Sequence, residues 1–320
     1  MRKGIKILFP ALIAALSLSG CDFISFGENV LDTYEDAGGY YNGYSLKGNK
    51  KQKLIIELQK MCWDKHKVFV PYGQVNNYYD KTSDRNSIDA LSDGSPYNQY
   101  FYTGYEGKAS STTKEHVWPC AKSGGLWDHK EASGIHYVDN TSYIGGGSDL
   151  YHVRPCNGTV NTARGDSYFL DFDDLENARY SGGMNVYDQT ETGGKYYLKL
   201  AEPDTNHQYA DYAEPADEMK GDVARIILYV WIHYAERGNT PEKEITSGKL
   251  TYKLTDMTGG LNLTGIMGYS SLTKTYEILK AWNKIDPPSE VEKLRNDTVE
   301  KIQGNRNPFV DYPKLVNNLF

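Results

Sequence analysis

Hydrophobic residues recur every three or four positions between Glu218 and Glu236, which is the spacing of one face of an α-helix. The apolar positions are Val223, Ile226, Ile227, Val230, Trp231 and Tyr234. Gly238-Asn239 and Pro241 follow directly, and these residue types commonly end helices. The pattern therefore predicts a helix over residues 218–236.

Shorter segments with the same spacing predict three more helices, over residues 53–60, 271–283 and 289–302. Residues 81–114 differ, because they are polar, with glycine and serine clusters and a tyrosine-rich piece around 97–105. We expect loops there, with one or two short strands. The 320 residues are 39% hydrophobic and 24% charged, which suits a globular protein with a substantial core.

The N-terminus is typical of an exported lipoprotein. Met1-Arg2-Lys3 is positively charged, and the apolar run from Ile5 to Leu18 is too short for a membrane-spanning helix. Ser19-Gly20 then precedes Cys21, so we expect residues 1–20 to be a signal peptide and Cys21 to carry a lipid anchor at a membrane surface. The alternative is an ordinary cleaved signal with a cysteine there by chance. Residues 21–50 are expected to form a flexible tether.

Three cysteines remain after Cys21, an odd number for an oxidising compartment. A disulfide between Cys120 and Cys156 would join two segments of interest, and the alternative is three free thiols that include Cys62. The sequence has no CxxC pair, so it does not predict a structural zinc site.

The formal net charge of −7 argues against a tight, sequence-specific nucleic-acid binder, which needs a basic surface. It does not exclude an enzyme that binds weakly, with a few local cations and a metal ion.

Two short segments carry residues suited to phosphodiester hydrolysis. Glu115 stands beside His116 in the first, and Asn161 lies in the second. Mg²⁺ accepts carboxylate and amide oxygens and keeps its other positions for water and a substrate phosphate. A neutral imidazole can take a proton from an attacking water. The residues therefore predict Glu115 and Asn161 as metal ligands and His116 as general base, with Mg²⁺ as the metal and Mn²⁺ or Ca²⁺ as alternatives.

Neighbouring residues are candidates for supporting roles. If a helix begins near Asn157, Asn161 and Arg164 share one of its faces, and Arg164 could clamp a phosphate oxygen. A surface salt bridge is the alternative for Arg164. The other candidates are Asp149 and His152, as groups that orient ligands or the base, and Lys114, as a contact to the nucleic-acid backbone. His152 could instead simply pack, and Lys114 could contact only water.

Together these segments resemble the bacterial endonuclease I family, secreted nucleases of the His-Me finger or ββα-metal superfamily. The chain reads T-K-E-H-V-W-P from Thr113 and D-L-Y-H-V-R-P-C-N-G-T-V-N-T-A-R-G from Asp149. Segments within 214–225, 286–297 and 303–309 look like the family's long helix and its C-terminal signature. The resemblance covers roughly residues 50–313.

The resemblance implies an α+β fold in which a two-stranded ribbon and a helix grip the ion, within a catalytic domain over residues 51–320. It implies a largely non-specific, metal-dependent endonuclease acting on DNA and often RNA, and the mechanism would leave 5′-phosphate ends. Three positions depart from the family pattern, and the first is Thr113, which replaces an asparagine. Lys114 replaces an arginine and loses its bidentate geometry, and Tyr151 replaces a common histidine, which would reduce activity if that histidine positions a ligand.

Other functions fit parts of the sequence. A surface-anchored binding lipoprotein could use its tyrosine-rich loops to hold a glycan or a host protein, with the nuclease motif decayed. A zinc-dependent hydrolase lacks support, because no HExxH motif or tight histidine cluster is visible along the chain. A nuclease narrowed to RNA is a third alternative. The expected partners are nucleic acid as substrate and a membrane through Cys21, with no protein partner predicted.

Overall fold

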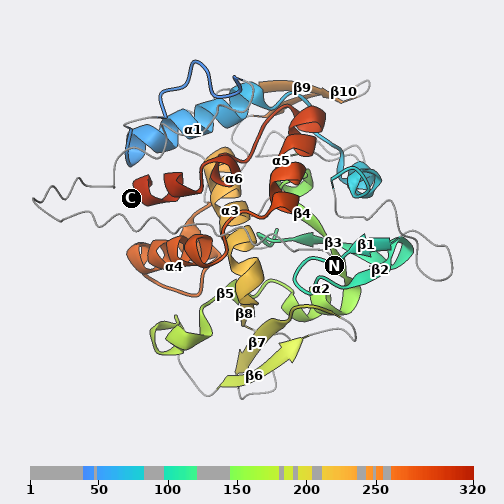
Figure 1. Cartoon of the computed structure of the whole chain (residues 1–320), viewed down its shortest axis with the longest axis vertical. Coiled ribbons are helices and arrows are strands. Elements are labelled where there is room, and N and C mark those ends of the chain that lie inside the picture. Colours follow the sequence, from blue (N-terminus) through green and yellow to red (C-terminus); the bar gives the residue numbers. More distant parts are fainter. Residues whose placement is uncertain are drawn as a thin grey trace, which may run out of the picture. The chain divides into compact units, whose positions relative to one another are not determined.

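The computed structural model describes residues 39–46, 49–82, 97–120, 145–179, 184–189, 194–203, 211–235, 243–247, 250–254 and 261–320. All of them belong to one compact unit, Glu35–Phe320, and Figure 1 shows its helices and strands. The predicted signal peptide and Cys21 lie outside the described residues. The architecture mixes helices with small sheets, so the predicted α+β class is confirmed.

The predicted helix 218–236 is α3 (Asp217–Tyr234), the central helix of this unit. Helices α1 (Gln52–Lys65), α4 (Leu272–Ile285) and α6 (Pro308–Asp311) all contact it (Figure 1). From Gly221 to Tyr234 every residue except Asp222 and Trp231 is buried. A helix covered on most sides buries polar positions as well, and this explains why Arg225 and His233 are fully buried although the apolar pattern marks one face only.

The other predicted helices are also confirmed. Helices α4 and α5 (Glu290–Gln303) begin within two residues of their predicted starts, because Ser271 and Ser289 cap them by accepting hydrogen bonds from backbone N–H groups. Helix α1 continues five residues beyond the predicted end at residue 60.

Tyr40 and Tyr41 fall within the predicted tether, yet both are buried. The Tyr41 hydroxyl donates a hydrogen bond to Asp311, and the Tyr40 hydroxyl accepts one from the Arg306 backbone at 2.9 Å. The compact unit therefore begins before residue 51, and the rest of the predicted division of the chain stays a prediction.

The largest sheet has four strands in the order β5-β8-β7-β6. The short strand β5 (Tyr168–Phe169) runs parallel to β8 (Tyr212–Pro215), while β7 (Leu198–Pro203) and β6 (Met184–Gln189) continue the sheet antiparallel. Two hairpins lie outside it, β1 (Tyr97–Gln99) with β2 (Glu106–Lys108) and β9 (Lys243–Ser247) with β10 (Leu250–Leu254).

A separate ribbon carries the two motif segments. Strands β3 (Thr112–His116) and β4 (Val153–Asn157) pair antiparallel, with Glu115 opposite Arg154. Helix α2 (Gly158–Arg164) starts directly after β4, because the Asn157 side chain accepts hydrogen bonds from two N–H groups of its first turn. The chain thus forms a strand–strand–helix unit in which α2 contacts both strands.

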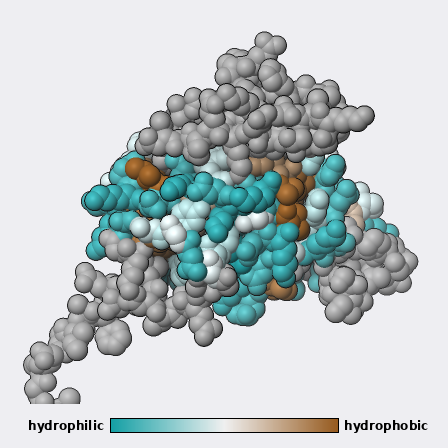
Figure 2. All heavy atoms as spheres, turned by 90° about the horizontal axis from the view of Figure 1, so that it is seen from above, coloured by the Kyte–Doolittle hydropathy of each residue, from teal (hydrophilic) through white to brown (hydrophobic). Residues whose placement is uncertain are grey.

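The face drawn in Figure 2 is mostly hydrophilic, with separate hydrophobic patches. The large apolar side chains that are most exposed among the described residues are Val68, Val186, Leu272, Ile285, Val291 and Leu294. None of the helices in the described part of the chain has the length and apolar character needed to cross a membrane.

Candidate active site

Helix α2 is tied to the end of β3 at two points. The amide nitrogen of Asn161 donates to Thr113 Oγ1 at 3.1 Å and to the Lys114 carbonyl at 3.3 Å. One turn later, the Arg164 guanidinium donates to the His116 carbonyl at 3.1 Å and pairs with Glu115 at 3.3 Å. The helix that the sequence predicted near Asn157 is confirmed, and it brings Asn161 and Arg164 beside the strand that holds Glu115 and His116.

Glu115 is a buried carboxylate with 1% exposure. Its Oε1 accepts a hydrogen bond from the Tyr102 hydroxyl at 2.7 Å and faces Arg164. Burial raises the pKa of Glu115, while the charge of Arg164 and the bond from Tyr102 oppose the rise. Tyr102 has φ of +70°, a conformation that is strained for a residue with a side chain, so the residue that supplies this hydroxyl has an uncommon backbone conformation.

His116 ends β3 and is held from two sides. Its Nε2 lies 2.7 Å from the carbonyl of Gly147, in the short helix η5 (Gly146–Ser148), and therefore donates its proton there. In the neutral ring Nδ1 then carries the lone pair that can accept a proton. The Tyr72 ring stacks on the imidazole with centroids 5.6 Å apart, and the Lys114 ammonium lies 4.4 Å from the centre of the Tyr72 ring.

The pKa of His116 is lowered to about 4, first by burial and further by the charges of Arg164 and Lys114. The bond to the Gly147 carbonyl opposes this shift. The imidazole is consequently neutral at pH 7, which is the protonation state that a general base needs.

His152 holds the glycine loop that orients His116. Its Nδ1 donates to the Gly146 carbonyl at 2.7 Å, and its Nε2 accepts from the Trp118 backbone N–H at 2.9 Å. Burial lowers its pKa to about 3, so this ring also stays neutral. In this structure His152 connects the chain after β3 to the loop that contains Gly147, and any role as an orienting group would act through that loop.

Asp149 lies in the same loop and is also buried. Its Oδ2 accepts hydrogen bonds from the Tyr229 and Tyr234 hydroxyls at 2.7 and 2.6 Å, and its Oδ1 accepts from the Tyr151 N–H and from Gln303. Asp149, His66 and His233 form a group whose ligand atoms all lie within 4.8 Å of one another and which could hold a metal ion. The sequence alone does not reveal this cluster, because its members are far apart along the chain.

Arg164 and Lys114 are placed differently from each other. Arg164 is 1% exposed, and its guanidinium also donates to the Val117 carbonyl at 2.7 Å, so in this structure it binds Glu115 and the backbone. Lys114 is half-buried, and burial lowers its pKa. Their expected contacts to phosphate stay predictions.

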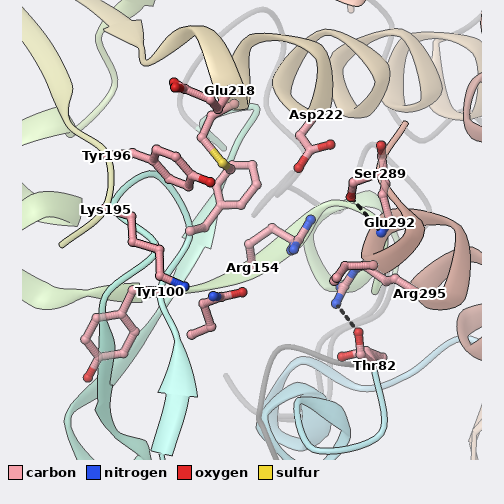
Figure 3. A pocket seen from close by; sticks show the side chains of 15 residues that line it. Thr82, Tyr100, Arg154, Lys195, Tyr196, Glu218, Asp222, Ser289, Glu292 and Arg295 are labelled. Carbon is pink, nitrogen blue, oxygen red and sulfur yellow. Dashed lines mark hydrogen bonds between the residues drawn. The ribbon is translucent and has the colours of Figure 1, made fainter. Parts of the chain in front are cut away.

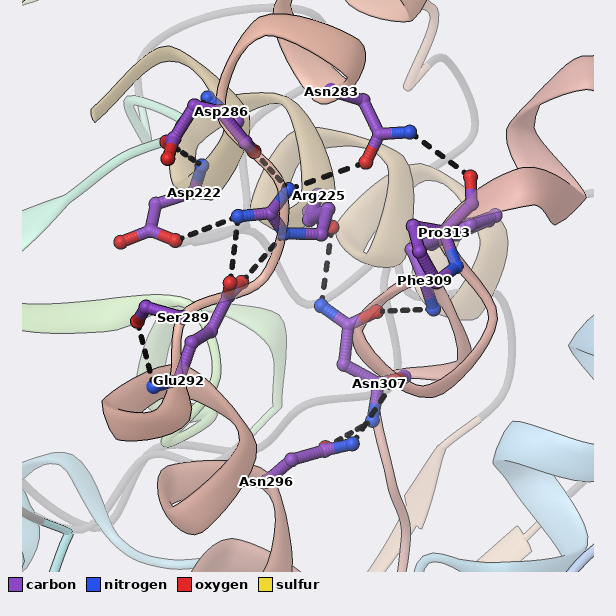
Figure 4. A network of polar contacts seen from close by, with 11 residues as sticks. Asp222, Arg225, Asn283, Asp286, Ser289, Glu292, Asn296, Asn307, Phe309 and Pro313 are labelled. Atoms are coloured by element: carbon purple, nitrogen blue, oxygen red, sulfur yellow. Dashed lines mark hydrogen bonds and ion pairs between the residues drawn. The ribbon is translucent and has the colours of Figure 1, made fainter. Parts of the chain in front are cut away.

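The downstream motifs support the fold. Tyr151 donates to the carbonyls of Asn296 and Asn305, which ties the second motif segment to the C-terminal region. Arg225 of α3 binds Glu292 through two bonds of 2.7 and 2.6 Å and also donates to the Asp286 carbonyl (Figure 4). These motifs therefore join α3, α4 and α5.

A cavity of about 280 Å³ lies on the other flank of β4, where Arg154 points into it (Figure 3). Its charged lining residues are Arg154, Lys195, Arg295, Glu218, Asp222 and Glu292. Cations and carboxylates are equal in number there, so the cavity has no net charge that would favour a phosphate. Glu115, His116 and Asn161 do not line it.

The described cysteines form no disulfide. Cys62 and Cys156 are buried and Cys120 is partly buried, and all three are free thiols. The disulfide considered between Cys120 and Cys156 is absent from this structure, and the alternative of three thiols holds.

A Glu-His pair thus ends one strand of the ribbon, and an asparagine lies on the helix that follows. This is the strand–strand–helix arrangement that the resemblance to secreted nucleases implied. Residues 42–314 match the Endonuclease I family, and the chain belongs to that family. Similar curated proteins are the extracellular ribonucleases of Bacillus subtilis (strain 168) and Bacillus amyloliquefaciens, each 31% identical over 215 residues. The alignments cover 67% of this chain but only 56% and 55% of those proteins, so the chain spans little more than half their length.

Proposed function

We propose that this chain is an exported, metal-dependent endonuclease that hydrolyses phosphodiester bonds of RNA and DNA with little sequence preference and leaves 5′-phosphate ends. One observation carries the proposal: β3 and α2 gather Glu115, His116 and Asn161, and the Gly147 carbonyl selects the tautomer of His116 that can act as a base.

His116 would act through Nδ1. A water beside the scissile phosphate gives its proton to this nitrogen and attacks phosphorus in line with the leaving 3′ oxygen. The bond between phosphorus and that oxygen breaks, and the phosphate stays on the 5′ side. Because Nε2 donates a hydrogen bond to a backbone carbonyl, the imidazole ring keeps its orientation when it gains a proton.

Glu115 and Asn161 would hold the metal ion, and their donor atoms fit a hard cation. The Asn161 amide nitrogen is engaged by Thr113 and Lys114, so Oδ1 is the atom that a cation would use. Tyr102 and Arg164 both contact Oε1 of Glu115, and they orient the carboxylate. Bound there, Mg²⁺ would stabilise the negative charge that develops on the phosphate oxygens and the leaving oxygen.

The relatives' printed names support the choice of substrate and location. Both are called extracellular ribonucleases, which favours RNA among the substrates and export for this chain. The lipoprotein-type signal favours an anchor at Cys21 on the outer face of a membrane. The net charge of −7 fits weak, transient binding of nucleic acid rather than tight recognition.

Digestion of plasmid DNA and of RNA by the purified chain, with Mg²⁺ or with EDTA, tests the proposal. We expect chelator-sensitive cleavage that Glu115→Gln and His116→Ala each reduce by about 100-fold or more. Glu290→Gln is the matched control, because Glu290 is an exposed carboxylate that pairs only with Lys293 among the described residues. Full activity of His116→Ala would remove this residue from the mechanism. No cleavage of either nucleic acid by the wild-type chain would favour a binding lipoprotein with a decayed site.

A further inference from the structure

A second cluster of metal-ligating side chains lies outside the candidate active site. His66 follows α1, Asp149 precedes β4, and His233 lies in the last turn of α3. Their ligand atoms lie within 4.8 Å of one another and all three residues are buried. We propose that they bind a transition-metal ion with a structural role, and that this ion is Zn²⁺, which accepts both imidazole and carboxylate ligands.

The charge of Asp149 is the first reason. This carboxylate is 2% exposed, and its four hydrogen bonds come from neutral donors. Among the described residues, no lysine or arginine forms an ion pair with it. A buried carboxylate without a counter-charge is unfavourable, and a divalent ion supplies that charge.

The orientation of His66 is the second reason. Its Nε2 lies 3.1 Å from the Val68 carbonyl and donates there, so the lone pair of Nδ1 points toward His233. Histidines that bind metals are held in this way by a carbonyl behind the ring. The two facing nitrogens are 2.8 Å apart and share one proton.

Zinc would replace that proton. His233 would then carry its single proton on Nδ1 in place of Nε2, so each ring stays neutral and no proton is released. Zn–N bonds of about 2.0–2.1 Å place two ligand nitrogens roughly 3.3 Å apart, which requires the rings to separate by about half an ångström. The four hydrogen bonds to Asp149 fill the four lone-pair positions of its carboxylate, so an ion bound there would take the place of one of these donors.

The metal would act on the fold and not on the substrate. It would link α1, α3 and the loop before β4, and that loop also contains Gly147, the residue that orients His116. This inference is independent of the proposed nuclease activity, because neither Glu115 nor Asn161 takes part in it.

Metal content and refolding of the full chain test the inference. We expect the purified protein to contain one zinc ion per chain by elemental analysis, and His233→Gln to lose it. His152→Gln is the matched control, since it alters another buried, hydrogen-bonded histidine but should keep the zinc. Glu115→Gln should also keep the zinc, so a failed nuclease proposal and a failed zinc proposal give different results.

Wild-type protein provides a test that does not depend on a variant folding. Unfolded in guanidinium with chelator and refolded with Zn²⁺, it should melt roughly 10 °C higher than when it is refolded with Mg²⁺ in place of Zn²⁺. Refolding with Co²⁺ should produce the visible absorption of cobalt bound to protein ligands. A metal-free protein whose melting temperature is unchanged by Zn²⁺ would overturn the inference, and the cluster would then be a hydrogen-bonded part of the core.

Discussion

A single backbone carbonyl determines which nitrogen of His116 can accept a proton. Because Gly147 binds Nε2 and burial lowers the pKa to about 4, the ring is neutral across the whole range in which histidine usually titrates. We expect kcat to stay constant from pH 8 down to about 5 and to fall tenfold per pH unit below about 4. Initial rates at saturating Mg²⁺ measure this. An acid limb centred near 6.5 would contradict the environment described for His116.

Tyr72 is a residue that the sequence analysis did not select. It begins the short helix η2 (Tyr72–Tyr78), which contacts η5, and its ring lies over both His116 and Lys114. Tyr72→Ala should lower kcat by about tenfold with little change in KM, because the imidazole loses its stacked neighbour and its fixed orientation. Tyr72→Phe keeps the ring and should retain activity within about twofold. If both variants raise KM equally, the hydroxyl binds substrate and the ring does not position the base.

The sequence revealed the residues whose chemistry is unusual but not the residues that orient them. Glu115, His116 and Asn161 could be selected because a carboxylate, an imidazole and an amide recur in a recognisable order. Tyr102 and Gly147 could not, because one contributes a hydroxyl and the other a carbonyl, groups found throughout the chain. Only the folded backbone shows which of them reaches the site.

At the scale of the elements, α3 and the end of α4 approach so closely that one position must be glycine. A Cβ on Gly221 would lie 1.8 Å from the Asp286 carbonyl oxygen, which belongs to the backbone and cannot move aside easily. Gly221→Ala should therefore destabilise the protein by about 2–3 kcal/mol or more, despite the better helix propensity of alanine. Chemical denaturation measures the change.

Gly158, the first residue of α2, offers the control for that prediction. A Cβ there would meet only a methyl group of Thr113 at 3.4 Å, an ordinary contact. Gly158→Ala should change stability by no more than about 1 kcal/mol. If Gly221→Ala and Gly158→Ala lower the free energy of unfolding by similar amounts, the helical context and not the contact with Asp286 determines the loss of stability.

Helices could be predicted from the sequence better than strands. The apolar period predicted α3, α4 and α5 to within two residues at each end, because each helix buries a continuous stripe. Local signals also mark their boundaries, as Ser289 does at the start of α5 and Gly304 at its end. The ribbon of β3 and β4 was expected only through the family resemblance, since its strands are five residues long and pair across a long connection. Burial of Arg225 and His233 could not be foreseen, because it depends on what covers the other faces of α3.

At the scale of the whole molecule, buried titratable groups act on stability in opposite directions. His116 and His152 have pKa values lowered to about 4 and about 3, so between these values and 6.5 the unfolded chain binds more protons and acid destabilises the fold. Asp286 has a pKa raised to about 6 by burial and by Asp222, so falling pH stabilises the fold through this group. The pH dependence of the wild type is the sum of these effects, and variants are needed to separate them.

His152→Gln isolates one contribution. Glutamine can donate to Gly146 and accept from Trp118, so the variant can fold, but it has no proton to gain. As pH falls from about 6.5 to 4, the free energy of unfolding of the wild type should fall by up to about 1.4 kcal/mol per pH unit relative to the variant, because only the unfolded wild type becomes protonated at residue 152.

Asp286→Asn should show the opposite sign, because the wild type should gain stability relative to this variant as pH falls below about 6. Denaturant titrations of the three proteins at several pH values measure both differences, and equal slopes for the wild type and His152→Gln would mean that the imidazole of His152 is protonated in the folded state as readily as in the unfolded one.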